Sequence, residues 1–312
     1  MRLSYVFATL ATLMWAGNFI VGRAVNESMS AIELNFWRWS IAALILLPFT
    51  YGKWRENSAV IRQSFRSLLA LACTGIALYH CLVYIALQST GSINATLVNS
   101  AVPVFVPILA YFILAKQLTV QGLIGTGLSI LGVTIVICKG SPLLIFDLAF
   151  VPGDIIMLLA ALIWSLYTVL LSKAPKLPAT LFLFLISGLG VCLLSPFMFY
   201  QVMYVGVFEL SVSNVLATAY IAVFAAVLAF LCWNKAVQIM GPVKTGLFAN
   251  LIPVFSAFLA VLFLQEALRL YHFIALALIV LGIYLNSGNL PSLSTKLFKS
   301  KESHYVSRKD RV

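Results

Sequence analysis

Residues 101–114 read AVPVFVPILAYFIL and residues 251–264 read LIPVFSAFLAVLFL, so one pattern occurs twice in the chain, 150 positions apart. Matches of Leu to Leu are expected by chance in an apolar sequence, but matches of Pro, Gly and Gln at one offset are not. Besides pairs of Leu, the matched pairs are Ala86 and Ala236, Gln88 and Gln238, Gly91 and Gly241, Pro103 and Pro253, Val104 and Val254, Phe105 and Phe255, Ala110 and Ala260, and Gly132 and Gly282. The chain therefore contains two copies of one unit.

The composition is that of a membrane protein. Hydrophobic residues make up 62% of the 312 residues and charged residues 9%, whereas about a quarter of the residues in soluble domains are charged. Spanning helices accommodate such a composition, because lipid solvates their side chains while the backbone hydrogen bonds internally. The net charge of +11 does not indicate nucleic-acid binding, since the 20 basic residues lie mostly in short breaks between apolar runs.

Apolar runs of spanning length predict ten transmembrane helices. They cover residues 3–25, 32–51, 67–87, 95–114, 120–138, 153–172, 179–203, 212–234, 245–264 and 268–285. Each copy holds five helices, and because five is an odd number the second copy enters the membrane from the opposite side, which gives an inverted repeat. The sequence thus predicts an all-α integral membrane protein. Its expected parts are a first repeat at 1–138, an extracytoplasmic connector at 139–152, a second repeat at 153–286 and a basic, disordered cytoplasmic tail at 287–312.

The basic residues predict the orientation in the membrane, because short cytoplasmic loops are rich in Lys and Arg. With the N-terminus inside, sixteen basic residues fall in inside loops and the tail, whereas Arg23, Lys139 and Arg269 fall outside. We therefore expect both termini to be cytoplasmic, in a bacterial plasma (inner) membrane.

Further motifs are spread over both copies. They are Trp15-Ala16-Gly17-Asn18-Phe19, Arg38, Tyr84, Ala86, Pro103-Val104-Phe105, Trp164, Trp233-Asn234-Lys235-Ala236, Gly241, Asn250, Pro253-Val254-Phe255, Glu266 and Gly282. In order and spacing, from residue 3 to about residue 286, they resemble the EamA-type ten-helix members of the drug/metabolite transporter superfamily. One departure is that Ala115-Lys116 stands opposite Gln265-Glu266, where that family usually ends helix four with a Gly-Glu pair. The resemblance implies export, or less often import, of amino acids, related metabolites or drugs.

Polar side chains within the predicted helices indicate a cavity, because such groups are costly in contact with lipid. Two stripes with a spacing of four residues stand out, one in each copy: His80, Tyr84 and Gln88, and Phe230, Asn234 and Gln238. Each stripe lies on one face of a helix and predicts a polar cavity wall. The alternative is a set of interhelical hydrogen bonds worth roughly 0.6 kcal/mol each.

Aromatic residues recur in helices one and six. Trp15 and Asn18 lie three residues apart, as do Trp164 and Tyr167, and Trp15 meets Trp164 at an offset of 149. Each pair shares one helical face and predicts a cavity lining. Packing between helices, or an aromatic belt at the membrane interface, is the alternative.

Three prolines are expected inside helices four and nine, where a proline frees a backbone carbonyl: Pro103, Pro107 and Pro253. Such breaks supply binding groups or hinges in transporters. A plain kink is the simpler interpretation for Pro107, which has no partner in the second copy. Asn99 and Asn250 flank the breaks, and they either orient a substrate amide or carboxylate or cap the freed carbonyls.

Arg38 and His80 are ionisable residues that lie well inside predicted helices rather than near their ends. Arg38 either attracts an anionic substrate or is held by carbonyls and nearby carboxylates such as Glu33. The resemblance favours the second, because it places this helix toward the periphery. His80 is the one mid-membrane group expected to titrate near neutral pH, since an imidazole has an ordinary pKa of about 6.5. Protons are therefore candidate partners, and a neutral, hydrogen-bonded histidine is the alternative.

The sequence predicts neither a cofactor nor a metal site, and it indicates no catalysis. No phosphate-binding loop, zinc pattern or nucleophile elbow is present, and the five cysteines have no C-x-x-C spacing. The leading hypothesis is a secondary transporter that exports an amino acid or a related amphipathic metabolite by alternating access. The sequence leaves the oligomeric state open, and a monomer is one plausible state.

Two other hypotheses remain open. A nucleotide-sugar or phosphosugar exchanger would need several Lys or Arg residues facing the cavity, whereas Lys235 and Lys244 are expected near the cytoplasmic surface. An integral membrane enzyme that modifies lipids would need His or acidic groups near the interface, for which His272 beside Glu266 and Arg269 is the candidate.

Overall fold

The computed structural model describes residues 2–25, 28–90, 95, 98–117, 119–138, 140, 141, 143, 151–206, 211–264 and 269–286. Most of the predicted connector and the whole predicted basic tail lie outside these residues, as does Glu266.

Apolar helical segments follow one another along the described chain and agree with the predicted all-α membrane fold. In order they are α1 (Arg2–Val25); α2 (Ala31–Leu46) with η1 (Leu47–Phe49); α5 (Phe65–Ala72), η2 (Cys73–Leu78) and α6 (Tyr79–Ser89); α8 (Val102–Leu114); α9 (Val120–Ile137); α10 (Pro152–Leu171); α11 (Ala179–Tyr200) with η4 (Gln201–Val205); α12 (Val212–Tyr220), η5 (Ile221–Leu228) and α13 (Ala229–Met240); α14 (Pro242–Gly246), η6 (Leu247–Asn250) and α15 (Leu251–Leu264); and α16 (Leu270–Asn286). By length and composition, six of these segments can cross a membrane, and α8, α9 and α16 are shorter apolar helices.

Two short helices occupy the region between the second and third predicted helices, where no helix is expected. They are α3 (Lys53–Glu56) and α4 (Ser58–Gln63). Gly52, which precedes them, has φ of 84°, a left-handed conformation that favours glycine and turns the chain away from the second segment. Trp54 of α3 then packs edge-on against Phe184, with ring centroids 6.1 Å apart. This aromatic contact fixes the connection against the body of the protein.

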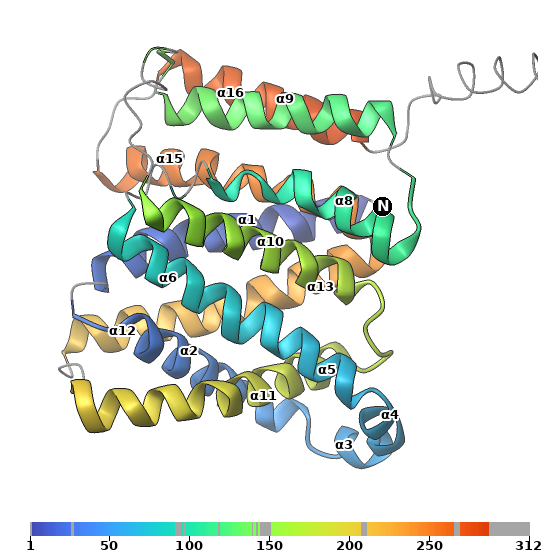
Figure 1. Ribbon diagram of the computed structural model, residues 1–312, viewed down its shortest axis with the longest axis vertical. Helices are drawn as coiled ribbons and strands as arrows, with labels where there is room; N and C mark the ends of the chain where they lie inside the picture. The colour runs from blue at the N-terminus through green and yellow to red at the C-terminus, as the bar shows by residue number, and fades with distance from the viewer. Residues whose placement is uncertain are drawn as a thin grey trace, which may run out of the picture.

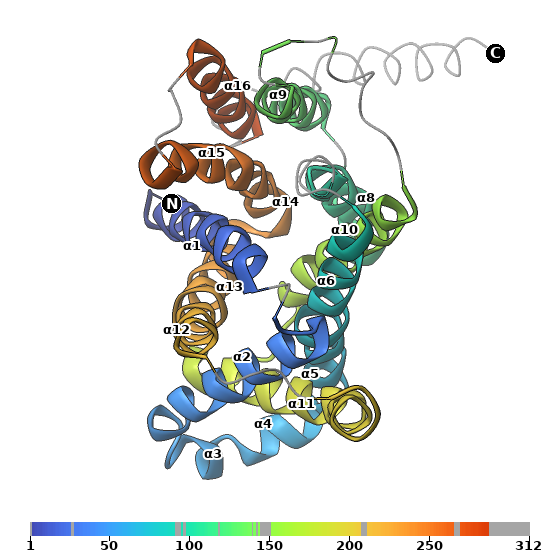
Figure 2. The ribbon, with the colours of Figure 1, turned by 90° about the vertical axis from the view of Figure 1, so that its left-hand side faces the viewer.

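The packing of the segments repeats from one copy to the other. α1 of the first copy packs on α13 and α15 of the second, and α10 of the second packs on α6 and α8 of the first. α2 packs on α11, and α9 packs on α16, so these segments pair with their own equivalents (Figure 1). Figure 2 shows the α9 and α16 pair stacked on α15 at one end of the molecule. This exchange of contacts is what a two-fold relation between two five-helix copies requires.

Both copies contain a π-helical stretch at an equivalent place. η2 interrupts the third segment from Cys73 to Leu78, and η5 interrupts the eighth from Ile221 to Leu228. A π-helical stretch shifts the register of the backbone hydrogen bonds, and such stretches often lie at functional sites. Here each one ends directly before the residues that face the centre of the molecule.

Candidate substrate-binding site

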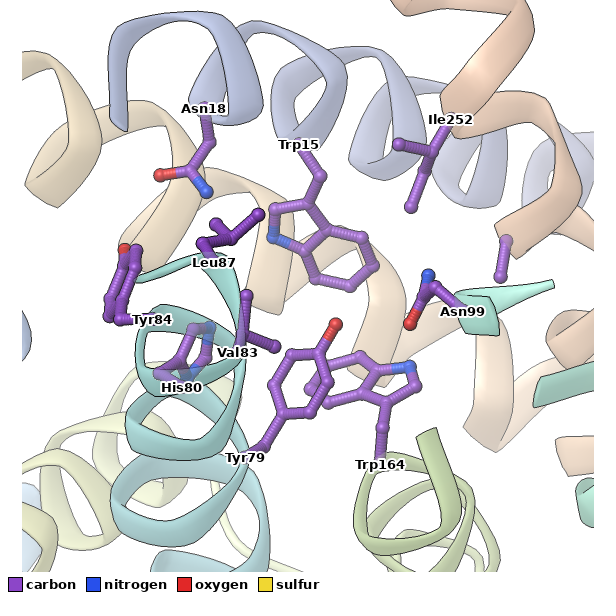
Figure 3. A pocket seen from close by; sticks show the side chains of 11 residues that line it. Trp15, Asn18, Tyr79, His80, Val83, Tyr84, Leu87, Asn99, Trp164 and Ile252 are labelled. Atoms are coloured by element: carbon purple, nitrogen blue, oxygen red, sulfur yellow. The ribbon is translucent and has the colours of Figure 1, made fainter. Parts of the chain in front are cut away.

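A cavity lies between the two copies at the centre of the bundle. Figure 3 shows the side chains around it. Its lining residues are Trp15, Asn18, Tyr79, His80, Val83, Tyr84, Leu87, Asn99, Trp164, Ala249 and Ile252. The first copy contributes α1, α6 and Asn99, and the second contributes α10, η6 and α15. The cavity is narrow, because only about 30 Å³ is open to the centre of a water molecule.

The equivalent tryptophans of the two copies meet at this cavity. The rings of Trp15 and Trp164 lie edge to face, with centroids 5.1 Å apart and planes at 87°. Trp15 also donates a hydrogen bond of 3.0 Å from Nε1 to the carbonyl of Ala225, which lies in η5. Phe230 packs against both tryptophans, at 5.8 and 5.6 Å. The π-helical stretch of the second copy is thereby tied to the first helix of the first copy.

On the other side of Trp164, a hydrogen bond joins two of the predicted site residues. The Tyr167 hydroxyl donates to Asn234 Oδ1 over 2.8 Å, and both side chains are buried. Neither belongs to the lining of the cavity. The equivalent residues of the other copy are Asn18 and Tyr84, and both of these do line it. Asn18 Oδ1 has no hydrogen-bond partner. The two equivalent pairs therefore differ. Tyr167 and Asn234 bond to each other outside the cavity lining, whereas Asn18 and Tyr84 line the cavity.

His80 is buried among aromatic rings. Its ring lies 4.8 Å from Tyr79 and 6.0 Å from both Phe230 and Trp39, measured between centroids. His80 Nδ1 is buried without a hydrogen-bond partner. Tyr79 lines the cavity but was not predicted, because it lies outside the stripe of His80 and Tyr84 and its nearest partners on α6, Val83 and Leu87, are apolar.

The remaining predicted site residues lie in different places. Asn99 lines the cavity, and its Oδ1 has no partner. Asn250 is fully buried beside the cavity wall, and neither its Oδ1 nor its Nδ2 has a partner. Gln88 and Gln238 have exposed side chains near the C-terminal ends of α6 and α13, and neither lines the cavity.

The predicted prolines also differ from expectation. Pro103 stands in the first turn of α8 and Pro253 in the first turn of α15, rather than in helix interiors. A proline in the first turn removes no helical hydrogen bond. The break instead precedes each proline, at the turn of Ser100 and at η6. Pro107 is the one of the three that lies within its helix.

Arg38 does not line the cavity but contacts Tyr84, which does. Its exposed fraction is 0%, and Nη1 donates to the Tyr84 hydroxyl over 3.1 Å. Its Cζ lies 5.3 Å from the centroid of the Trp39 ring. Nε and Nη2 are buried without a hydrogen-bond partner, so neither carbonyls nor carboxylates hold them. Glu33 instead caps α2, where its Oε2 accepts from the Ser30 amide over 2.9 Å.

Other chemistry has few candidates in the described part of the chain. No group of three or more His, Cys, Asp or Glu side chains there is placed to hold a metal ion. His272, considered above for an enzyme, is buried beside Tyr271 and accepts from or donates to the backbone of Arg269 through Nδ1.

Comparison with known proteins gives a consistent result. A model described as the EamA-like transporter family matches residues 2–138 and again residues 151–288. An uncharacterized transporter of Bacillus subtilis, YyaM, is 30% identical over 310 residues, covering 95% of this chain and 96% of that protein. An uncharacterized inner membrane transporter of Salmonella typhimurium, YicL, is 24% identical and covers 89% of this chain and 93% of its own length. A protein solved by crystallography has the same fold, with a TM-score of 0.74 at 18% identity over 91% of this chain and 96% of that one.

Proposed function

Because the chain belongs to the EamA-like transporter family, whose model covers both copies, we propose that it exports a small amphipathic metabolite by alternating access. The chain is thus a membrane transporter, and its cargo is an amino acid or a related compound. The observation that carries the proposal is the central cavity between the copies, where Trp15 and Trp164 meet and polar groups without partners face inward.

The chemistry of the lining supports an amphipathic cargo. Trp15, Tyr79 and Trp164 offer aromatic faces for an apolar body. Asn18 and Asn99 each have a buried amide oxygen without a partner, and such a group is costly until it accepts a hydrogen bond. An ammonium or amide group of a cargo would satisfy them. Binding sites for small molecules commonly combine a mostly apolar wall with a few polar groups that fix orientation.

The difference between the equivalent pairs supports alternating access. In an inverted repeat, exchanging the conformations of the two copies turns a site open to one side into a site open to the other. The Tyr167–Asn234 hydrogen bond holds these two side chains away from the cavity and closes that side of it, whereas Asn18 and Tyr84 line the cavity. In the opposite state the roles reverse: Asn18 bonds to Tyr84, and Tyr167 and Asn234 face the cargo.

The narrow cavity fits a closed stage of this cycle. The space of about 30 Å³ holds roughly two water molecules and no metabolite. Cargo therefore enters only when the copies move apart. The packing of the aromatic rings around Trp164 and Phe230 must then loosen to widen the cavity.

A phosphate-bearing cargo is less well matched. The described residues that line the cavity include neither Lys nor Arg. A sugar phosphate or nucleotide would require several such groups to balance its charge.

The test is transport by the purified protein in proteoliposomes. Labelled amino acids and related amphipathic compounds are supplied on either side, with and without a pH gradient. We expect saturable movement of at least one compound, and a lower rate after Trp164→Ala. Transport of nucleotide sugars or sugar phosphates alone would contradict the proposed cargo class.

A further inference from the structure

Arg38 is a buried charge that the fold leaves incompletely compensated. It lies on α2 with no exposed surface, and three of its five N–H groups, those on Nε and Nη2, have no acceptor. One neutral hydroxyl, on Tyr84, accepts from Nη1, and one aromatic ring, Trp39, lies beside the guanidinium.

These two contacts do not balance the cost of burial. A guanidinium keeps its proton in proteins, so the charge cannot be removed. Burying an unpaired ion costs more free energy than one cation–π contact and one hydrogen bond to a neutral hydroxyl return. An anion that enters the region would therefore be stabilised strongly, and intramembrane charges of this kind commonly mark a transport path.

The route from Arg38 to the cavity runs through Tyr84. The Tyr84 oxygen accepts from Arg38, so its own O–H is available to donate, and Tyr84 lines the cavity. In the view of Figure 3, Asn18, Tyr84 and His80 lie at one end of the cavity, and Asn99 and Ile252 lie at the other. A positive charge behind Tyr84 strengthens this donor and attracts an anion to this end.

We propose that Arg38, acting with Tyr84, binds a carboxylate of the cargo, which makes the transported compound an amphipathic carboxylic acid. The inference rests on the proposed function, because it assigns the chemical class of the same cargo. One oxygen of the carboxylate accepts from the Tyr84 hydroxyl, and Arg38, whose Nε and Nη2 groups have no acceptor, supplies the positive charge beside it. A single buried positive charge matches a carboxylate monoanion better than a phosphate dianion.

The experiment compares matched acids and amides that share one apolar body. The probes are benzoate with benzamide and phenylalanine with phenylalaninamide, titrated into the purified full-length protein. Quenching or enhancement of Trp fluorescence reports binding, since Trp15 and Trp164 line the cavity. In the wild type we expect each acid to bind at least about tenfold more tightly than its amide, as hydrogen bonds to a charged group imply.

Variants distinguish the effect of the Arg38 charge on acid binding from a general effect on folding. Arg38→Gln should reduce the acid preference to less than about twofold, and Arg38→Lys should retain part of it. Tyr84→Phe keeps the charge but removes the hydroxyl, so it should weaken acid binding while the variant stays folded. Arg55→Gln on the exposed helix α3 is the matched control and should bind like wild type.

Equal binding of acids and amides by the wild type, or an acid preference that survives Arg38→Gln, would overturn the inference. If Arg38→Gln does not fold, an unchanged acid preference in Tyr84→Phe and Arg38→Lys together overturns it. The proposed function fails separately, if acids bind in an Arg38-dependent way but no compound crosses the membrane of proteoliposomes.

Discussion

The Tyr167–Asn234 hydrogen bond should stabilise the closed side of the cavity. Asn234→Ala leaves the buried Tyr167 hydroxyl without its acceptor, which costs roughly 1–3 kcal/mol of stability. Tyr167→Phe should cost less, since the hydroxyl itself is removed. The double variant should be no less stable than Asn234→Ala, because both changes remove the same bond. Thermal unfolding in detergent measures this cycle, and additive losses would mean that the two side chains act independently.

Among single residues, the equivalence of Trp15 and Trp164 follows from the repeat, and the structure brings their rings into contact at the cavity. Tyr79 could not be predicted in this way, because it lies outside the stripe that contains His80 and Gln88. The cavity faces Tyr79, whereas Gln88, in the last turn of α6, does not line it.

The partners of Arg38 could not be predicted either. They depend on the packing of α2 against α6, which no spacing in the sequence reports.

Proton coupling, if it occurs, should depend on His80. Among the described residues that line the cavity it is the one histidine, and an imidazole ring nitrogen can take up and release a proton. His80→Gln should abolish stimulation of transport by a pH gradient while cargo exchange continues. Flux measurements in proteoliposomes with imposed gradients test this. Undiminished stimulation in the variant would remove His80 from the coupling mechanism.

At the element scale, the apolar runs predicted where the helical segments lie but not all of their ends. The eighth segment was expected to stop at residue 234, whereas α13 continues to Met240. Lys235 and Gln238 end the apolar run, but their exposed side chains leave the backbone hydrogen bonds of the helix undisturbed. The π-helical stretches η2 and η5 were not predicted, because they depend on contacts with other segments. Asn35, for example, donates to the carbonyl of Ile76 over 3.1 Å.

The contact between η2 and α11 should be sensitive to one added methyl group. A Cβ at Gly190 would overlap the Ile76 side chain, whereas a Cβ at Gly188, on the same helix, would meet nothing within 4 Å. Gly190→Ala should therefore destabilise the protein by about 1–3 kcal/mol. Gly188→Ala is the matched control and should be neutral or slightly stabilising. Equal melting temperatures for the two variants in detergent would show that η2 is not tightly packed.

At the scale of the whole molecule, the repeat predicted more than any single motif. It implied that each contact between the two copies occurs a second time with the copies exchanged. The contact of α1 with α13 and the contact of α10 with α6 are such a pair. The bounds of the two repeats and the orientation in the membrane remain predictions. The repeat could not reveal the difference between the Tyr167–Asn234 pair, which is hydrogen bonded, and the Asn18–Tyr84 pair, which lines the cavity. Equivalent sequences do not show which conformation each copy adopts.

The orientation can be tested directly. The basic residues place the stretch from Lys53 to Arg66 in the cytoplasm, so Val60→Cys should resist a membrane-impermeant thiol reagent in intact cells. The native cysteines should first be replaced, because Cys192 is exposed. Permeabilised cells, in which the introduced cysteine should react, provide the control. Efficient labelling in intact cells would reverse the orientation.

The central claim is that cargo binds in the cavity between the two copies, and transport kinetics in proteoliposomes test it most directly. Tyr84→Phe should raise the apparent substrate constant about tenfold, because it removes a buried hydrogen bond worth roughly 1–3 kcal/mol to the cargo. Trp164→Ala should lower transport further, through loss of aromatic contact. Leu131→Ala, on the half-exposed face of α9, is the control and should behave like wild type. If both cavity variants transport every tested compound with wild-type kinetics, the cargo binds elsewhere.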